Sequence, residues 1–272
     1  MTRLPPSSCA APVPAAGPRS GSTARPAAGG TGRLVLWDVD HTLVSIDRVG
    51  REIYELAFTE LFGRPLPDVG AVPMAGRTDR AIALEVLAAA GVTDPLAQLG
   101  PFHQIQAARA ASLAGRVREH GRVLPGVPGA LAAVAAGRPG ITVVQSLLTG
   151  NLRAMAAVKL GALGLLDASS PLDIDAGAYG TESETRADLV PVARRHAAAR
   201  YGARLGGTDF SGLATVLVGD TPLDIEAALV AGARAVGVAT GQFSGAVLAA
   251  AGAHAVLPDL TDTAQVVAAI LG

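Results

Sequence analysis

The sequence predicts an α/β protein in which a doubly wound parallel sheet carries an inserted helical domain. Short apolar runs alternate with segments of helical periodicity, as the strands and helices of a parallel sheet do. Polar residues follow three of these runs, at the strand ends where open parallel sheets bind ligands. A long helical stretch separates the first run from the second. With 272 residues, half of them apolar, the chain is long enough for one such domain and an insertion.

The N-terminal segment, residues 1–32, is predicted to be a disordered tail. It is crowded with proline and small residues, and it has too few large apolar side chains to offset the entropy of ordering. Order is expected to begin at Arg33, where the run Arg33–Trp37 is typical of a buried parallel strand. The polar sequence Asp38–Thr42 follows that strand directly.

Residues 48–121 are predicted to form the inserted helical domain. Apolar residues recur at helical spacing twice in this stretch, at Ile53, Leu56, Ala57 and Leu61 and again at Ile82, Val86 and Leu87. The other ordered residues, 33–47 and 122–272, are assigned to the sheet domain.

In residues 122–272, the sequence predicts three further strands, at residues 141–148, 215–218 and 235–239. An Ala-rich helix is expected after Leu124–Val127, and others after Asn151, over residues 185–201 and from Thr261. Thr221 suits the N-cap of a helix and Pro222 its first position.

Composition excludes several classes of protein. Lys and Arg number 22 against 23 Asp and Glu, a balance that argues against nucleic-acid binding. Cys9 is the single cysteine, so neither an intrachain disulfide nor a cysteine zinc cluster can form, and Lys159, the sole lysine, does not fit a P-loop. The longest apolar stretch, residues 123–137, is shorter than the about 20 residues of a membrane span, and the N-terminus does not resemble a secretory signal. We expect a cytoplasmic protein without a membrane partner.

The three polar strand ends predict a phosphoryl-transfer site. An Asp after a strand is most often a turn former or a helix cap, but three such ends on one sheet converge on one crevice. Carboxylates that converge need a cation, and oxygen ligands favour Mg²⁺. A helix N-terminus after Thr149 would attract an anion. One Asp can then act as a nucleophile, and the next, with a pKa raised by its neighbour's charge, as a general acid and base. The residues concerned are Asp38 and Asp40, Thr149 and Asn151, and Asp220 and Asp224.

Asp38–Leu43, Leu147–Asn151 and Val218–Asp224 resemble motifs I, II and IV of the haloacid dehalogenase superfamily, and most closely its phosphoglycolate phosphatase-like members. The resemblance covers residues 33–272 and implies a Rossmann-like core with a helical cap. It implies that Asp38 is the nucleophile, that Asp40 is the general acid and base, and that Mg²⁺ is the cofactor. The implied metal ligands are Asp38, the backbone carbonyl of Asp40, and Asp220, supported by Asp224; the implied phosphate-binding residues are Thr149, Gly150 and Asn151.

The sequence departs from the family at two places. His41 stands where the family usually has glycine, and the expected lysine of motif III is missing. Arg186, at the start of a predicted helix, is our candidate to replace that lysine, because an arginine can neutralise Asp38 and the transferring phosphate together. The alternative is a surface arginine paired with Glu182 or Glu184. Lys159 is the rival candidate, but it lies near the C-terminal end of its helix, where a cation simply complements the helix dipole.

The helical insertion has the position of a C1-type cap, which in the family covers the site and contacts the substrate. Hinges are expected near Ser45–Arg48 and His120–Leu124. Arg77, in the polar cluster Gly76–Arg80, is the candidate substrate contact; the alternative for this cluster is an ordinary helix cap formed by Thr78 or Asp79.

The predicted function is therefore a Mg²⁺-dependent phosphatase that acts on a small phosphorylated molecule through an aspartyl-phosphate. A sugar-phosphate phosphomutase of the same fold is the first alternative, and a non-catalytic phospholigand-binding module is the second. A dehalogenase is disfavoured, because the family's dehalogenases lack the second Asp. The sequence leaves the substrate and the oligomeric state open.

Overall fold

The computed structural model describes residues 31–46, 49–69 and 72–272. Its main sheet has six strands in the order β5-β4-β1-β6-β7-β8, and every pairing in it is parallel. The predicted tail lies outside the described residues, apart from Thr31 and Gly32, which already belong to the first strand. The strands are β1 (Thr31–Trp37), β4 (Ile141–Thr149), β5 (Ala178–Tyr179), β6 (Thr215–Gly219), β7 (Arg234–Val238) and β8 (Ala255–Leu257).

The register of the central strands brings their carboxyl ends to one edge of the sheet. Trp37, the last residue of β1, pairs with Leu147 on β4 and with Val218 on β6. The residues that follow these three strands therefore emerge side by side, as the polar strand ends predicted.

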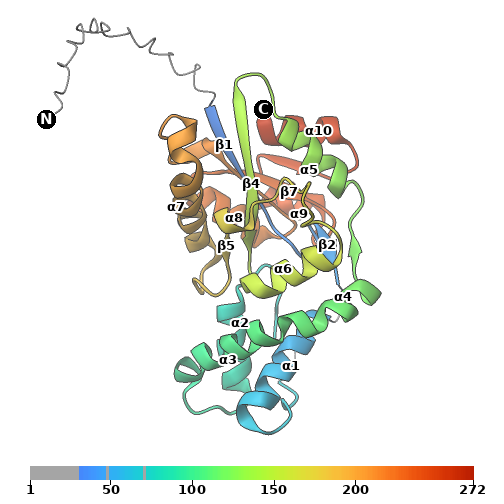
Figure 1. The fold of residues 1–272 in the computed structure, drawn as a ribbon, viewed down its shortest axis with the longest axis vertical. Helices are drawn as coiled ribbons and strands as arrows, with labels where there is room; N and C mark the ends of the chain where they lie inside the picture. Colours follow the sequence, from blue (N-terminus) through green and yellow to red (C-terminus); the bar gives the residue numbers. More distant parts are fainter. Residues whose placement is uncertain (1–30, 47–48, 70–71) are drawn as a thin grey trace, which may run out of the picture.

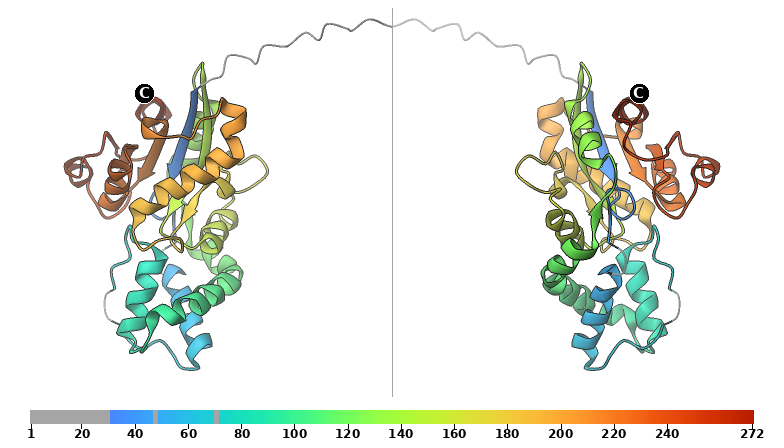
Figure 2. Two further views of the ribbon diagram at one scale, coloured as in Figure 1. Left: turned by 90° about the vertical axis from the view of Figure 1, so that its left-hand side faces the viewer. Right: turned by 90° about the vertical axis from the view of Figure 1, so that its right-hand side faces the viewer.

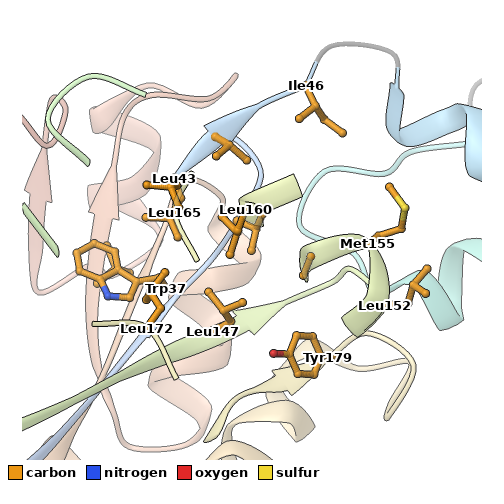
Figure 3. Close-up of a cluster of buried hydrophobic side chains, with 14 of the residues drawn as sticks. Trp37, Leu43, Ile46, Leu147, Leu152, Met155, Leu160, Leu165, Leu172 and Tyr179 are labelled. Carbon is orange, nitrogen blue, oxygen red and sulfur yellow. The ribbon is translucent and has the colours of Figure 1, made fainter. Parts of the chain in front are cut away.

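Helices cover both faces of this sheet (Figures 1 and 2), which confirms the doubly wound α/β fold. On one face, Val35 and Trp37 belong to a core that includes α5, α6 and α10. Figure 3 shows part of this core, with Trp37 and the α6 residues Met155 and Leu160. On the other face, Leu34 and Leu36 pack with α7, α8 and α9. The alternation of β1 side chains between two cores is the period-two pattern of a strand buried on both faces. The helices are α5 (Val127–Ala136), α6 (Arg153–Ala162), α7 (Leu189–Tyr201), α8 (Pro222–Val230), α9 (Gly245–Ala250) and α10 (Thr263–Leu271).

Four helices between β1 and β4 gather beyond one end of the sheet (Figure 1), and we call them the insert. Ile53, Ala57, Val86 and Leu87 are buried on them as predicted, whereas Leu56 is 41% exposed. The proposed boundaries of this part, residues 48–121, stay a prediction. The insert comprises α1 (Val49–Phe62), α2 (Asp79–Ala89), α3 (Pro95–Ala110) and α4 (Ala114–His120), with a 3₁₀ turn at Ala111–Leu113.

The chain enters and leaves the insert through a small antiparallel ladder. β2 (Val44–Ser45) pairs with β3 (Arg122–Val123), and Leu124 N donates to Leu43 O at 3.0 Å. The ladder lies where the two hinges are expected, although residues 47–48 of the first hinge are outside the described residues.

Further 3₁₀ turns at Ile174–Ala176, Arg186–Asp188, Gly202–Leu205 and Gly212–Ala214 connect the elements of the sheet domain. Among the helices that the structure describes, none is long and apolar enough to cross a membrane.

Candidate functional site

The residues after β1, β4 and β6 meet at one end of the sheet. Carboxylate oxygens of Asp38, Asp220 and Asp224 lie within 4.8 Å of one another, and all three side chains are buried. Two of these residues, Asp38 and Asp220, directly follow strands β1 and β6. The sheet register thus assembles a carboxylate cluster from two distant parts of the chain.

A capping box at the start of α8 places Asp224. The Thr221 hydroxyl accepts a hydrogen bond from Asp224 N at 3.3 Å, while Asp224 Oδ2 accepts from Thr221 N at 3.1 Å and from the Thr221 hydroxyl at 2.7 Å. Pro222 occupies the first turn, as predicted. A side chain at Gly219 would put its Cβ 2.1 Å from the Asp224 carboxyl carbon, so only glycine fits at the end of β6. The other carboxylate oxygen of Asp224, Oδ1, takes no part in the capping box, and the residue belongs to the carboxylate cluster with Asp38 and Asp220.

His41 adopts the backbone conformation for which the family's glycine is suited. Its φ is +58°, in the left-handed region that side chains rarely enter. The turn is held by a hydrogen bond from His41 N to Val44 O at 2.7 Å and by one from the Thr240 hydroxyl to His41 O at 2.5 Å. The substitution therefore keeps the turn that follows Asp40.

Arg186 lies inside the carboxylate cluster. Its Nη2 atom is 2.7 Å from Asp38 Oδ1, 2.6 Å from Asp224 Oδ1 and 3.2 Å from Leu148 O, and its Nη1 donates to Gly76 O at 3.0 Å. The alternative of a surface arginine is wrong, because the side chain is 5% exposed. The two glutamates expected in that alternative have other partners: Glu182 accepts from Tyr179 N, and Glu184 pairs with Arg80.

Lys159 corrects a second expectation. It does not simply complement the dipole of α6; its side chain is 4% exposed, and Nζ lies 2.6 and 2.8 Å from the Asp40 carboxylate oxygens and 2.5 Å from Asn151 Oδ1. Asn151 Nδ2 in turn donates to Asp40 Oδ2 and to the Thr149 hydroxyl, each at 2.8 Å. The signal in the sequence was helical spacing, since Lys159 shares the inward face of α6 with Met155 and Ala156.

The environments of the aspartates shift their pKa values in different directions. Burial raises the pKa of Asp38 to about 6, although Arg186 opposes the rise. Burial, followed by the charges of Asp38 and Asp224, raises the pKa of Asp220 to about 8. Burial also pushes the pKa of Asp40 upward, but Lys159 and Asn151 outweigh it and hold that pKa below its ordinary value. The expected rise of the Asp40 pKa is therefore wrong, because the ion pair with Lys159 and the hydrogen bonds to Asp40 outweigh the effect of burial.

A cavity of about 580 Å³ joins the carboxylate cluster to the insert. Arg77 lines it, but the guanidinium group is engaged within the insert, with Nη1 2.7 Å from Glu85 and 2.9 Å from Pro73 O. Thr78 is the N-cap of α2, as the alternative for this cluster predicted. Residues of both parts line the cavity: Asp38, Asp40, Thr149, Gly150, Asn151, Lys159, Arg186 and Asp220 from the sheet domain, and Tyr54, Met74, Arg77 and Asp79 from the insert and its loops.

Comparison with known proteins finds a family model that matches the chain and solved structures that have a similar fold. The family model for haloacid dehalogenase-like hydrolases matches residues 35–229. No curated protein matches the sequence. Among solved structures, a hydrolase from Pseudomonas syringae has 20% identity and a TM-score of 0.56, with 88% of this chain and 99% of that chain covered.

Two further solved structures are similar. A protein from Clostridium acetobutylicum, described as a predicted phosphatase, has 14% identity and a TM-score of 0.57, with coverage of 88% and 99%. A candidate β-phosphoglucomutase from Bacteroides vulgatus has 16% identity and a TM-score of 0.56, with coverage of 89% and 91%. At these identities the likeness extends to the fold alone.

Proposed function

Because the chain belongs to the haloacid dehalogenase-like hydrolases, we propose that it is a Mg²⁺-dependent phosphatase that acts on a small phosphomonoester through a phosphorylated Asp38. The observation that carries the proposal is the buried Asp38 carboxylate, which Arg186 holds by one oxygen at 2.7 Å on the wall of the cavity. An arginine in that position can neutralise both the nucleophile and the phosphate that approaches it. The phosphoglycolate phosphatase-like subgroup stays a prediction.

The carboxylate cluster supports a magnesium site. Its donors are hard oxygen atoms, which Mg²⁺ prefers, and the single positive charge of Arg186 does not balance three buried carboxylates. Asp38, Asp220 and the backbone carbonyl of Asp40 would hold the ion, and Asp224 would support its water shell. When bound, the ion would neutralise the carboxylates and polarise the phosphoryl group.

In the first step, the second carboxylate oxygen of Asp38 attacks phosphorus and the ester P–O bond breaks. The departing alcohol oxygen takes a proton from Asp40. The Thr149 hydroxyl and the backbone of Gly150 bind the phosphoryl oxygens at the start of α6, and Arg186 stabilises the charge that they carry.

In the second step, Asp40 takes a proton from water, whose oxygen attacks phosphorus. The bond between phosphorus and Asp38 breaks, which restores the carboxylate and releases inorganic phosphate. The ion pair with Lys159 keeps Asp40 deprotonated before this step, as a group that accepts a proton must be. For the acidic role, the anionic substrate must compete for Lys159 and so raise the proton affinity of Asp40.

The cavity volume supports a small substrate, because it lies within the range of about 300–1,000 Å³ that is typical of small-molecule sites. Arg77 is proposed to contact the part of the substrate that is not transferred. To do so, its guanidinium group must exchange Glu85 for a substrate oxygen.

The test is a panel of phosphorylated metabolites assayed with Mg²⁺ for released phosphate. Release from one or a few small monoesters is expected. Hexose 1-phosphates in the panel separate the phosphomutase alternative, because a mutase would return an isomeric sugar phosphate with little free phosphate. Binding without any turnover would overturn the phosphatase proposal and favour the binding module.

A further inference from the structure

Asp79, the first residue of α2, joins the insert to the loop after β4. We propose that Asp79 is a positioning residue that holds the 149–151 loop in its anion-binding conformation, so that phosphate binding depends on the docked insert. The proposal rests on the phosphatase function only in assuming that this loop binds phosphate.

The first observation is a hydrogen bond from the core to the insert. Leu152 N donates to Asp79 Oδ2 at 2.5 Å, and Leu152 directly follows Asn151 and is the N-cap residue of α6. The backbone N–H of an N-cap residue has no carbonyl acceptor within its own helix, so the Leu152 N–H needs an acceptor group from elsewhere. Asp79 supplies that group from a different part of the chain.

The second observation is that the other oxygen of Asp79 is also engaged. The Tyr54 hydroxyl donates to Asp79 Oδ1 at 2.5 Å, and Tyr54 is buried on α1. Asp79 itself is 8% exposed. The carboxylate therefore bridges α1, α2 and the start of α6.

The backbone of the insert also contacts the backbone of the 149–151 loop directly. Asp79 N donates to Gly150 O at 2.6 Å, and Arg80 N donates to Gly180 O at 2.9 Å. A Cβ at Gly150 would lie 1.9 Å from Arg77 O, so a side chain at this position would push the insert away from the loop. The Gly150 peptide is thus fixed from the side of the insert.

The simpler alternative is that Asp79 only stabilises its own helix. An acidic residue in the first turn complements the helix dipole. The N-cap of α2, however, is Thr78, whose hydroxyl accepts from Ala81 N at 3.3 Å. Both carboxylate oxygens of Asp79 are bonded to other elements, which the dipole does not require.

The test compares Asp79→Ala, Asp79→Asn and Tyr54→Phe with Asp94→Ala as the matched control. Asp94 is the exposed N-cap of α3, and it accepts from Ala97 N at 3.0 Å within the insert. Its removal weakens a helix of the insert without touching the loop. Three experiments are made on each variant: hydrogen exchange in the peptide that contains Leu152, the Kd for inorganic phosphate with Mg²⁺, and steady-state kinetics (kcat and KM) for the best ester.

Asp79→Ala should accelerate exchange at Leu152 and raise the Kd for phosphate about 10–100-fold, the loss expected for a charge-assisted hydrogen bond. KM should rise with Kd and kcat should change less, because the loop binds phosphate in the ground state too. Asp79→Asn keeps an acceptor oxygen and should restore most of the binding. Tyr54→Phe should have a smaller effect, about 2–5-fold, since the Leu152 bond remains. Asp94→Ala should leave Kd unchanged.

Unchanged Leu152 exchange and phosphate Kd in Asp79→Ala would overturn the proposal. So would an equal rise of Kd in Asp94→Ala, which would mean that any weakening of the insert has the same effect. If Asp79→Ala does not fold, Tyr54→Phe decides: unchanged Leu152 exchange and phosphate Kd in that variant would overturn the proposal. If the wild-type protein releases phosphate from no ester, the proposed function fails, while the exchange at Leu152 still decides the role of Asp79.

Discussion

Two neighbouring aspartates in the site are each paired with a different cation. Arg186 binds Asp38, and Lys159 binds Asp40. Asp38→Asn should reduce turnover to background, because an amide is not a competent nucleophile and no phosphorylated enzyme can form. Steady-state phosphate release measures the effect, with Asp94→Asn as the control for loss of one carboxylate. Substantial activity in Asp38→Asn would assign the nucleophile to another residue.

Asp40→Asn should keep the nucleophile and lose the proton transfers, which are typically worth about 10²–10⁴-fold. The loss should be smallest for p-nitrophenyl phosphate, whose leaving group needs little protonation. With that substrate the variant should accumulate phosphorylated Asp38, visible by intact-mass spectrometry as a gain of about 80 Da that hydroxylamine removes. If Asp40→Asn is equally inactive on good and poor leaving groups, Asp40 is not the general acid.

At the scale of elements, the turn before α5 depends on one glycine. Gly126 has a φ of +80°, and a Cβ there would lie 2.1 Å from Leu260 O. Gly126→Ala should lower the free energy of unfolding by several kcal/mol, because a backbone collision adds to the strain of about 1–2 kcal/mol for a side chain in this conformation. Urea unfolding measures the change.

Gly91→Ala is the matched control for this prediction. Gly91 has a φ of +77°, but nothing lies within 4 Å of the Cβ that alanine would add. The control should therefore cost only the backbone strain. Equal losses of stability in the two variants would show that α5 shifts freely away from Leu260.

The central strands of the sheet could be predicted from the sequence, but the two edge strands could not. Strands β1, β4, β6 and β7 follow from apolar runs long enough to show a pattern. The edge strands β5 and β8 have two and three residues, too short for any periodicity. Lys159 was misjudged for a different reason: its position along α6 suggested a dipole partner, whereas its partner, Asp40, is far away in sequence and is brought close by the fold.

At the scale of the whole molecule, the carboxylate cluster should make both activity and stability depend on Mg²⁺. EDTA should abolish turnover and Mg²⁺ should restore it, with Ca²⁺ a poor replacement because its looser coordination would misplace the nucleophile. Mg²⁺ should also raise the thermal midpoint, since a ligand that binds only the folded state stabilises it. Differential scanning calorimetry measures the shift, and Asp220→Asn should diminish it. Full activity in EDTA would contradict the metal-dependent mechanism.

The ladder between β2 and β3 has a consequence for how this architecture diversifies. Because Val44 pairs with Val123, the two ends of the insert leave the sheet domain side by side. An insertion whose two ends are adjacent can be exchanged, in evolution or by design, for another of different length without a change in the strand order of the sheet. Such an exchange has one chemical condition. A donor module without a carboxylate at the place of Asp79 would dock on the sheet domain and still leave the Leu152 amide without its acceptor.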